Sequence, residues 1–422
     1  MSGASEVRTP LQYVARVRYG MGQPPSLAEE GGLPIIRATN IERGRITTEH
    51  LQRAHPADLP LDRAPLLQAG EILVVRSGAY TGDSALITEA WAGSAPGYDL
   101  RVTPLRGTEP RFLAWCLLSR YCLDQLDLSK MRAAQPHLNA DELASVRVPL
   151  PPSSRQRGIA DYLDGETARI DALLDRSAQL GRLVRERHER FVVSAVCEGV
   201  GHDARLAAAG VDWLDRVNTE FVIGPYAMFA RTGSGHTPSR SVPEYWVDCD
   251  VPWVTTGDVK RVRSGYIEYV EETAERISQL GMANSAARLH PAGTVFLSRT
   301  ASVGFAGIMA VPMATSQDFF TWTPDARLRS EYLLWSLRAM RYAGHFDRLM
   351  YGSTHKTVYV PDLMVLRGPV PPLDEQDQIV AAIREQRDET IALLDTLERA
   401  NRLLAERRQA LITAAVIGEL EV

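Results

Sequence analysis

The chain has 422 residues, of which 45% are apolar, with 47 basic and 52 acidic side chains and a formal net charge of −5. This length allows two to four domains, and the charge is not the profile of a simple nucleic-acid binder. No run of about 18 apolar residues is present, and residues 1–10 lack an apolar signal core. We therefore expect a cytoplasmic protein that has no membrane span and no membrane partner.

The cysteines predict neither a metal site nor a disulfide framework. The chain has four of them, none in a Cys-x-x-Cys pair, and no two histidines have zinc-ligand spacing. Reduced, partly buried thiols are the expected state. From the sequence we expect no metal and no cofactor.

One stretch of the chain occurs twice. The first copy, Pro149–Val196, and the second copy, Pro369–Val416, both open with Pro-x-Pro-Pro and share Gln156 and Gln376 at the same place. The offset is constant, because 376 − 156 = 220 and 416 − 196 = 220. A gap-free match of this length indicates an internal repeat.

Each copy predicts one long helix after a proline stop, with Ser154 and Asp374 as the expected N-caps. Apolar residues recur at heptad spacing, which predicts two helices paired as a coiled coil. The alternative is two unrelated amphipathic surface helices, which the constant 220-residue register argues against. The predicted main seam contains Leu163, Ile170, Val184 and Phe191 with Ile383, Leu397, Leu404 and Leu411, and the neighbouring seam contains Leu173, Leu180 and Leu393.

Two blocks with the same order of predicted elements precede the two helices. In residues 1–150, a strand-like segment at 33–41 is followed by a turn and buried strand at 70–78. In residues 201–370, the matching segments lie at 251–259 and 293–300. Identity is lower than in the helices and the offset drifts between 213 and 223. The sequence thus predicts a shared frame that carries different exposed residues.

Three polar loops occupy matching places in the two blocks. Base edges in DNA are read by Arg, Asn, Gln, Lys, Ser and Thr side chains, and these loops carry such residues. Any single member is equally well explained as a solvated loop residue, but the recurrence favours DNA binding for the sets. The first loop is Arg37, Thr39, Asn40 and Arg43 with Thr255, Thr256, Asp258 and Lys260; the second is Arg76, Ser77 and Tyr80 with Arg299, Thr300 and Ser302; the third is Arg132, Gln135, His137 and Asn139 with His355, Lys356, Thr357 and Tyr359.

Common catalytic motifs are missing from the sequence. It has no Gly-Lys-Ser/Thr phosphate loop, no Asn/Asp-Pro-Pro-Tyr/Phe segment of amino-methyltransferases and no Gly-x-Ser-x-Gly elbow. Asp258-Val259-Lys260 has the local spacing of a nuclease centre but falls where a strand ends in a loop. We therefore expect a binding protein without catalytic residues.

The chain resembles the specificity subunit of type I restriction–modification enzymes over essentially its whole length. The residues that carry the resemblance are the Gly-x-x-Pro turn at Gly235–Pro238, the stretch Gly293–Arg299 with Gly304, and above all the repeated proline entry to a long helix. The form Pro-Pro-Leu-Asp-Glu-Gln at Pro371–Gln376 is the most specific of these. The first copy departs from it and reads Pro-Pro-Ser-Ser-Arg-Gln.

The resemblance implies an α/β protein with two target-recognition domains, at 1–152 and 201–370, separated by two long antiparallel helices at 153–200 and 371–422. Each domain would read half of a split double-stranded DNA target, and the helices would act as a ruler between the halves. The implied partners are two methyltransferase subunits, with restriction/translocase subunits added for cleavage. The subunit itself would be non-catalytic. The alternatives are a helix-paired scaffold that recognises protein, and an orphan specificity protein without a methyltransferase partner.

Overall fold

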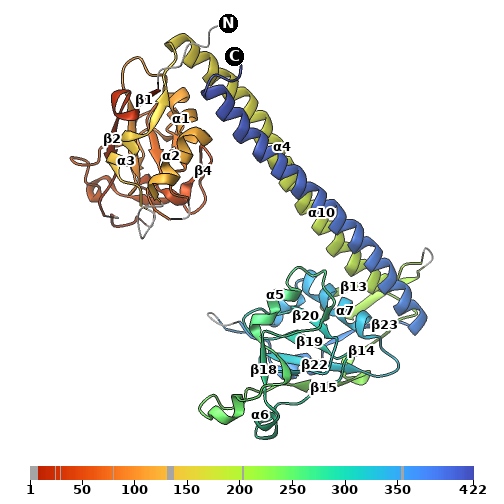
Figure 1. Cartoon of the computed structure of the whole chain (residues 1–422). Coiled ribbons are helices and arrows are strands. Elements are labelled where there is room, and N and C mark those ends of the chain that lie inside the picture. The colour runs from red at the N-terminus through yellow and green to blue at the C-terminus, as the bar shows by residue number, and fades with distance from the viewer. Residues whose placement is uncertain are drawn as a thin grey trace. The chain divides into compact units, whose positions relative to one another are not determined.

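The protein is described from a computed structural model, which covers residues 8–23, 25–28, 30–78, 80–130, 137–201, 204–352 and 356–422. The chain forms two compact units. Unit 1 comprises residues 1–178 and 398–422, and unit 2 comprises residues 179–397. Each unit contains one mixed helix-and-sheet head and part of both long helices (Figure 1). No helix in the described ranges has the length and apolar character needed to cross a bilayer.

The two predicted long helices are present as α4 (Ser153–Glu198) and α10 (Leu373–Val416). They pack antiparallel within each unit, and Figure 1 shows them side by side. In unit 1, Arg408 Nε donates to Asp171 Oδ1 at 2.9 Å, and in unit 2 the His188 ring pairs with the Gln386 side chain. The predicted N-caps were wrong, because both helices begin one residue earlier and place Ser154 and Asp374 inside the first turn.

The second seam of the helix pair was also predicted wrongly. Leu173, Leu180 and Leu393 are 49%, 44% and 41% exposed. The second buried row instead lies four residues after the first, and in α4 it includes Thr167 and His188. Leu173, Leu180 and Leu393 each lie three positions after a position of the first row. At that spacing a side chain lies on the opposite side of the first row from the second row and faces solvent. The second buried row was not predicted because it contains small and polar residues, which give no apolar heptad pattern.

Head 1 is built around a four-stranded antiparallel sheet of order β2-β10-β7-β8, beside a smaller sheet in which β3 pairs antiparallel with β6 and parallel with β9. Strand β1 pairs with β11, which leads into α4. The elements are β1 (Arg8–Pro10), η1 (Leu11–Tyr13), β2 (Ala15–Tyr19), β3 (Leu33–Ile36), η2 (Ala38–Asn40), β4 (Ile41–Glu42), β5 (Arg45–Ile46), β6 (Gln52–Ala54), η3 (Pro56–Asp58), β7 (Ile72–Val74), β8 (Ser84–Leu86), η4 (Glu89–Trp91), β9 (Ala95–Pro96), β10 (Leu100–Pro104), α1 (Pro110–Leu118), α2 (Arg120–Lys130), α3 (Ala140–Ser145) and β11 (Arg147–Pro149).

Head 2 repeats this order around a sheet of order β15-β22-β19-β20-β17, with β16 pairing β18 and β21 as β3 pairs β6 and β9. Its additions include the hairpin β12–β13. The elements are β12 (Leu206–Val211), β13 (Leu214–Asn218), β14 (Val222–Pro225), η5 (Tyr226–Met228), β15 (Ala230–Ser234), η6 (Pro243–Trp246), β16 (Val251–Val254), η7 (Thr256–Asp258), α5 (Val259–Val262), β17 (Tyr269–Val270), β18 (Glu275–Ile277), α6 (Gln279–Ala283), β19 (Val295–Ser298), β20 (Ala306–Met309), β21 (Ala314–Thr315), β22 (Phe319–Pro324), α7 (Ser330–Tyr342), α8 (His345–Leu349), α9 (Val360–Met364) and β23 (Arg367–Val370).

The repeated glutamine of the proline motif fixes each head to the helix that follows it. Gln156 is 2% exposed, and its side-chain oxygen accepts from Glu109 N at 2.9 Å. Gln376 is fully buried and accepts from Arg329 N at 2.8 Å. The Gln156 side-chain amide also donates to Pro151 O, and the Gln376 amide donates to Pro371 O. The repeat is therefore a structural joint between head and helix.

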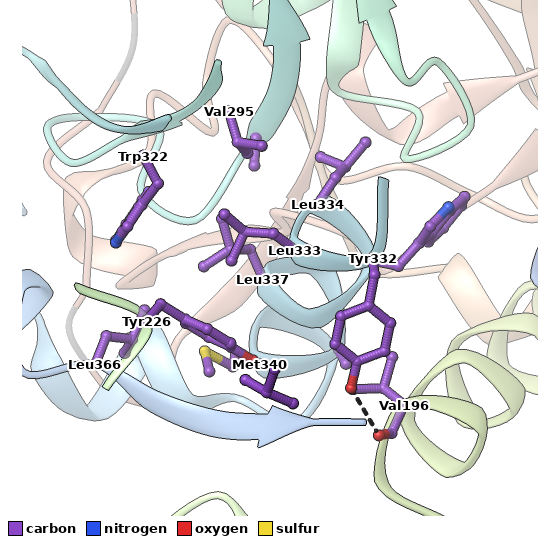
Figure 2. Packing of buried hydrophobic residues seen from close by; sticks show 14 of the residues in the cluster. Val196, Tyr226, Val295, Trp322, Tyr332, Leu333, Leu334, Leu337, Met340 and Leu366 are labelled. Atoms are coloured by element: carbon purple, nitrogen blue, oxygen red, sulfur yellow. Dashed lines mark hydrogen bonds between the residues drawn. The ribbon is translucent and has the colours of Figure 1, made fainter. Parts of the chain in front are cut away.

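The core of unit 2 continues from the head into α4. Helix α7 supplies Tyr332, whose ring is buried and whose hydroxyl donates to Val196 O at 3.3 Å, as Figure 2 shows. The same hydroxyl lies 3.0 Å from Pro369 O, where β23 ends. Val196 is itself fully buried, so the end of α4 is an internal element of unit 2.

Candidate nucleic-acid interface

In head 1 the second and third predicted loops lie side by side. The loop after β7 carries Arg76 and Ser77, and the segment before α3 carries His137 and Asn139. Ser77 and His137 form an antiparallel bridge, and Leu138 N donates to Arg76 O at 2.8 Å. Asn139 is the N-cap of α3 and its side-chain oxygen accepts from the third helical N–H. Strand pairing thus gathers residues that are about 60 positions apart in the sequence.

The same arrangement recurs in head 2. Thr300 and Thr357 form an antiparallel bridge. Val358 N donates to Arg299 O at 2.9 Å, which is the counterpart of the backbone bond to Arg76 O in head 1. The structure therefore places the two arginines at equivalent backbone positions, each at the junction of two predicted loops.

The remaining described members of these two loops are near the surface. Tyr80, Lys356 and Tyr359 are exposed. Ser302 is half-buried, and its hydroxyl accepts from Arg263 Nη2 at 3.5 Å. These side chains belong to the loop segments that meet at the two arginines, and they are accessible to a ligand. Three further predicted residues, Arg132, Gln135 and His355, lie outside the described residues.

The first predicted loop of head 1 is partly used for internal bonding. Arg37 Nη2 donates to His50 O at 3.0 Å. Arg43 has a positive φ of 47°, and its N–H donates to Asp83 Oδ2 at 2.8 Å. Thr39 is exposed. Internal hydrogen bonds therefore hold the side chain of Arg37 and the backbone of Arg43, whereas the side chain of Thr39 is exposed.

Asn40 and Asp258 have structural roles, which corrects their selection as candidate DNA contacts. They are 0% and 1% exposed. Asn40 Oδ1 accepts from Arg37 N at 3.3 Å, and Asp258 Oδ2 accepts from Thr255 N at 2.9 Å. The other Asp258 oxygen accepts from Ala274 N at 2.8 Å. A short polar side chain at a turn often satisfies its own backbone in this way. Both residues therefore shape the loop, and neither is placed to read DNA.

The rest of this loop in head 2 divides in the same manner. Thr255 is 9% exposed and its hydroxyl donates to Asp258 Oδ2 at 3.2 Å. Thr256 and Lys260 are exposed, the first in η7 and the second in α5. Of the four residues predicted here, only Thr256 and Lys260 present accessible side chains.

The guanidinium of Arg76 is held by aromatic rings. Its central carbon lies 4.8 Å from the ring centre of Tyr19 and 4.3 Å from that of Tyr98. Its Nε is buried without a hydrogen-bond partner, and within the described residues no carboxylate forms an ion pair with it. Below it, the Asp99 carboxylate accepts from Arg76 N at 3.1 Å. Burial raises the pKa of Asp99, and N–H donors from Arg76 and Ala38 partly oppose that shift.

The guanidinium of Arg299 is held by backbone carbonyl groups instead. Its Nε donates to Gln317 O at 2.9 Å, and its Nη1 donates to Val358 O at 3.4 Å. These bonds fix the side chain against the segments that flank it. The two equivalent arginines are thus anchored by different chemistry.

The sequence reasoning missed several residues of these clusters. Tyr19 and Tyr98 lie at the end of β2 and just before β10, and both are 47% exposed. In head 2, Tyr351 is 56% exposed, and its ring centre lies 5.4 Å from that of Tyr359. Tyrosines beside glycines at strand ends were the available signal, since Tyr19 precedes Gly20. Across the ranges that the structure describes, no group of three or more His, Cys, Asp or Glu could hold a metal ion.

The two heads share one backbone frame, and in each of them two of the predicted loops meet at an arginine. The sequence model of the type I restriction modification DNA specificity domain matches residues 23–180 and 229–400. Together these matches cover most of the chain, and the chain belongs to this family.

Curated relatives are also specificity subunits of type I restriction enzymes. The chain is 27% identical over 170 residues to the type I restriction enzyme MjaIX specificity subunit of Methanocaldococcus jannaschii, a match that covers 40% of this chain and 38% of the relative. It is 22% identical over 209 residues to the StySPI specificity subunit of Salmonella potsdam, covering 49% and 45%. The matched segments thus span less than half of these relatives.

The fold is shared with two solved chains. One comes from a study of the assembly and conformational transition of a type I restriction–modification system, with a TM-score of 0.68, 18% identity and 100% coverage of both chains. The other is the HsdS subunit of Thermoanaerobacter tengcongensis, with a TM-score of 0.51, 17% identity and coverage of 99% of this chain and 98% of that one. At these identities the likeness concerns the fold alone.

Proposed function

We propose that the chain is the DNA-recognition subunit of a type I restriction–modification complex. Head 1, within residues 1–152, and head 2, within residues 201–370, each read one half of a split DNA target, and the helices at 153–200 and 371–422 connect them. The observation that carries the proposal is the pair of arginine junctions, at Arg76 and Arg299, which share a backbone frame and differ in side-chain surroundings. Equivalent frames with different chemistry suit two different half-sites.

The proposed DNA contacts are the predicted loop residues whose side chains remain accessible or adaptable. Phosphates attract arginine and lysine, and base edges are read by arginine, lysine, serine, threonine, asparagine and glutamine. Asn40, Thr255 and Asp258 are excluded because they are buried in the turns. The proposed set is Arg37, Thr39, Arg43, Arg76, Ser77, Tyr80, His137 and Asn139 in head 1, and Thr256, Lys260, Arg299, Thr300, Ser302, Lys356, Thr357 and Tyr359 in head 2.

The proposed partners are two methyltransferase subunits, with restriction/translocase subunits joining for cleavage. The 47 basic residues of the chain are outnumbered by 52 acidic ones, so the chain has no overall positive charge to hold a long phosphate track. Methyltransferase subunits would supply the remaining phosphate contacts and the catalytic residues, so the chain itself is non-catalytic. Mass measurement of the purified assembly tests the stoichiometry, with two methyltransferase subunits per chain as the expected result.

The decisive experiment is enrichment of bound duplexes from a random DNA library. The chain is co-purified with the methyltransferase encoded beside it, and the bound duplexes are sequenced. We expect a gapped motif with two short specified halves. A stable complex that enriches no sequence would instead support a protein-interaction scaffold and refute the proposal.

We also propose that the helices set the length of the unspecified gap. An insertion directly after Val196 is unsuitable, because that residue is fully buried in the core of unit 2. Seven residues added to each helix, after Ala178 in α4 and after Leu397 in α10, keep the heptad seam and lengthen each helix by about 10.5 Å. That length is about three base pairs. We expect a longer gap between unchanged halves, and an unchanged gap would contradict the role of the helices.

A further inference from the structure

In head 1 the side chains of Tyr19 and Tyr98 both contact the guanidinium of Arg76, and we call this pair of tyrosines the clamp. The Tyr19 and Tyr98 ring centres lie 4.8 Å and 4.3 Å from the guanidinium carbon. Both rings are 47% exposed, so the clamp opens to solvent on the side away from the core.

The backbone around the clamp is tightly fixed. Gly20 N donates to Asp99 O at 2.9 Å, and a Cβ at Gly20 would lie only 2.1 Å from Gly97 O. A Cβ at Gly97 would lie 2.6 Å from Ile36 O. Each clamp tyrosine is therefore adjacent to a glycine that permits close backbone approach. The glycines set the positions from which the two rings project.

The clamp residues are tied to the third loop as well. The Tyr19 hydroxyl accepts a hydrogen bond from Ala140 N at 3.2 Å, at the start of α3. On the arginine side, Leu138 N donates to Arg76 O at 2.8 Å. The segment 138–140 therefore holds both the backbone of Arg76 and the side chain of Tyr19. This organisation reduces the conformational freedom that Arg76 would lose on binding.

Stacking leaves the hydrogen-bonding edge of a guanidinium available. An aromatic ring interacts with the face of the planar group, while the N–H donors point outward in its plane. The Arg76 guanidinium makes no hydrogen bond to another described residue; its Nε is buried, so Nη1 and Nη2 form the edge that a ligand can meet. An arginine with a free planar edge matches the O6 and N7 acceptors of guanine in the major groove.

We propose that Tyr19 and Tyr98 are positioning residues that hold Arg76 to read a guanine in the half-site of head 1. This inference rests on the proposed DNA-recognition function and adds one base and two residues to it. Within the described residues no aromatic ring lies over the Arg299 guanidinium, whose Nε and Nη1 donate to carbonyl oxygens. The guanine preference through a stacked arginine therefore belongs to head 1 alone.

The test uses the complex with its methyltransferase and a panel of single-base variants of the enriched motif. Arg76→Ala removes the guanidinium, so discrimination at one guanine should fall by about 5- to 150-fold. Tyr98→Ala should lower it by about 3- to 30-fold, whereas Tyr98→Phe should keep it because the ring remains. As a control, Tyr13→Ala removes a tyrosine of the same head that is 67% exposed and outside the clamp, and it should change nothing.

The outcomes separate this inference from the proposed function. Discrimination in the other half-site should be unchanged in every variant, which also shows that the complex is folded. A uniform loss over all bases would identify Arg76 as a phosphate contact and overturn the inference. Retained guanine discrimination in Arg76→Ala would overturn it too, even if Tyr98→Ala failed to fold. A wild-type complex that enriches no gapped motif would refute the proposed function itself.

Discussion

The two arginine junctions show how a duplicated frame supports different chemistry. Arg76 and Arg299 have equivalent backbone bonds, to Leu138 N and Val358 N. In head 1 the guanidinium meets tyrosine rings, and in head 2 it bonds carbonyl oxygens. Backbone pairing is insensitive to side-chain identity, so it is retained while the residues around it diverge. The lesson is that equivalence of position does not imply equivalence of contact.

The loops also differ at one strained position. Gly78 in head 1 has a φ of 91°, and Ala301, two residues after the arginine in head 2, has a φ of 61°. Glycine adopts this region readily, whereas alanine is strained there. Ala301 N donates to Lys356 O at 3.0 Å, which helps to hold the conformation. Head 2 therefore stores strain that head 1 avoids.

The largest expected difference concerns the glutamine joints. Gln376 bonds Arg329 N and Arg327 O in addition to its proline partner, whereas Gln156 bonds Glu109 N and its proline partner. Gln376→Ala should destabilise unit 2 by about 2–3 kcal/mol, and Gln156→Ala should destabilise unit 1 by about 1–2 kcal/mol, because buried backbone groups lose their partners. Denaturant unfolding followed by hydrogen exchange in each unit measures both values. Equal losses would show that the extra bond contributes little.

Acid should weaken unit 2 more than unit 1. Burial lowers the pKa of His188, His290 and His345 in unit 2, to about 4 for His290. An unfolded histidine has a pKa of about 6.5, so the unfolded state binds more protons and stability falls below that pH. His290 alone should cost about 1–2 kcal/mol at pH 5.

In unit 1 the carboxyl groups of Asp83 and Asp99 have the opposite effect on stability as the pH falls. Burial raises the pKa of Asp83 and Asp99, so their contribution is greatest at low pH and is lost as pH rises through the folded-state values. Hydrogen exchange at pH 7 and pH 5, corrected for intrinsic rates, should show greater loss of protection in unit 2. His290→Gln should reduce that loss, and identical losses in both units would contradict the assignment.

Arg299 and Arg76 should contribute differently to the stability of their units. Arg299→Ala should destabilise unit 2 by about 1 kcal/mol, because two carbonyl groups lose a charged donor. Arg76→Ala should cost unit 1 less than about 1 kcal/mol, since it loses only partly exposed ring contacts. Exchange rates of the peptides that contain Gln317 and Val358 report the first effect. Comparable destabilisation in the two units would mean that the tyrosine clamp is chiefly structural.

The smallest effect is expected at the strained position. Ala301→Gly should stabilise unit 2 by about 0.5 kcal/mol, because relief of strain slightly exceeds the added freedom of the unfolded chain. Gly78→Ala in head 1 should destabilise unit 1 by about 1 kcal/mol. Thermal unfolding of the two variants checks the opposite signs. A destabilised Ala301→Gly variant would show that the loop is not strained.

Periodic features of the sequence were predicted well. The proline entry, Gln156, Gln376 and one heptad row all follow from a repeat at constant spacing, and both long helices are present. The second row was missed because it uses Gly181 and His188, which carry little apolar signal. Hydrophobic spacing identifies a helix face only where the residues on it are apolar.

The sequence by itself determined the duplication, the two long helices and the positions of the two arginine loops, because repeats and helix periods are local properties of the chain. Tertiary structure decided that Tyr19 and Tyr98 meet Arg76, although they lie 57 and 22 residues away from it. It also decided that Asn40 is buried in a turn while its neighbour Thr39 is exposed. Contacts of this kind depend on strand register and backbone approach, and no pattern along a single chain records which distant segments pair.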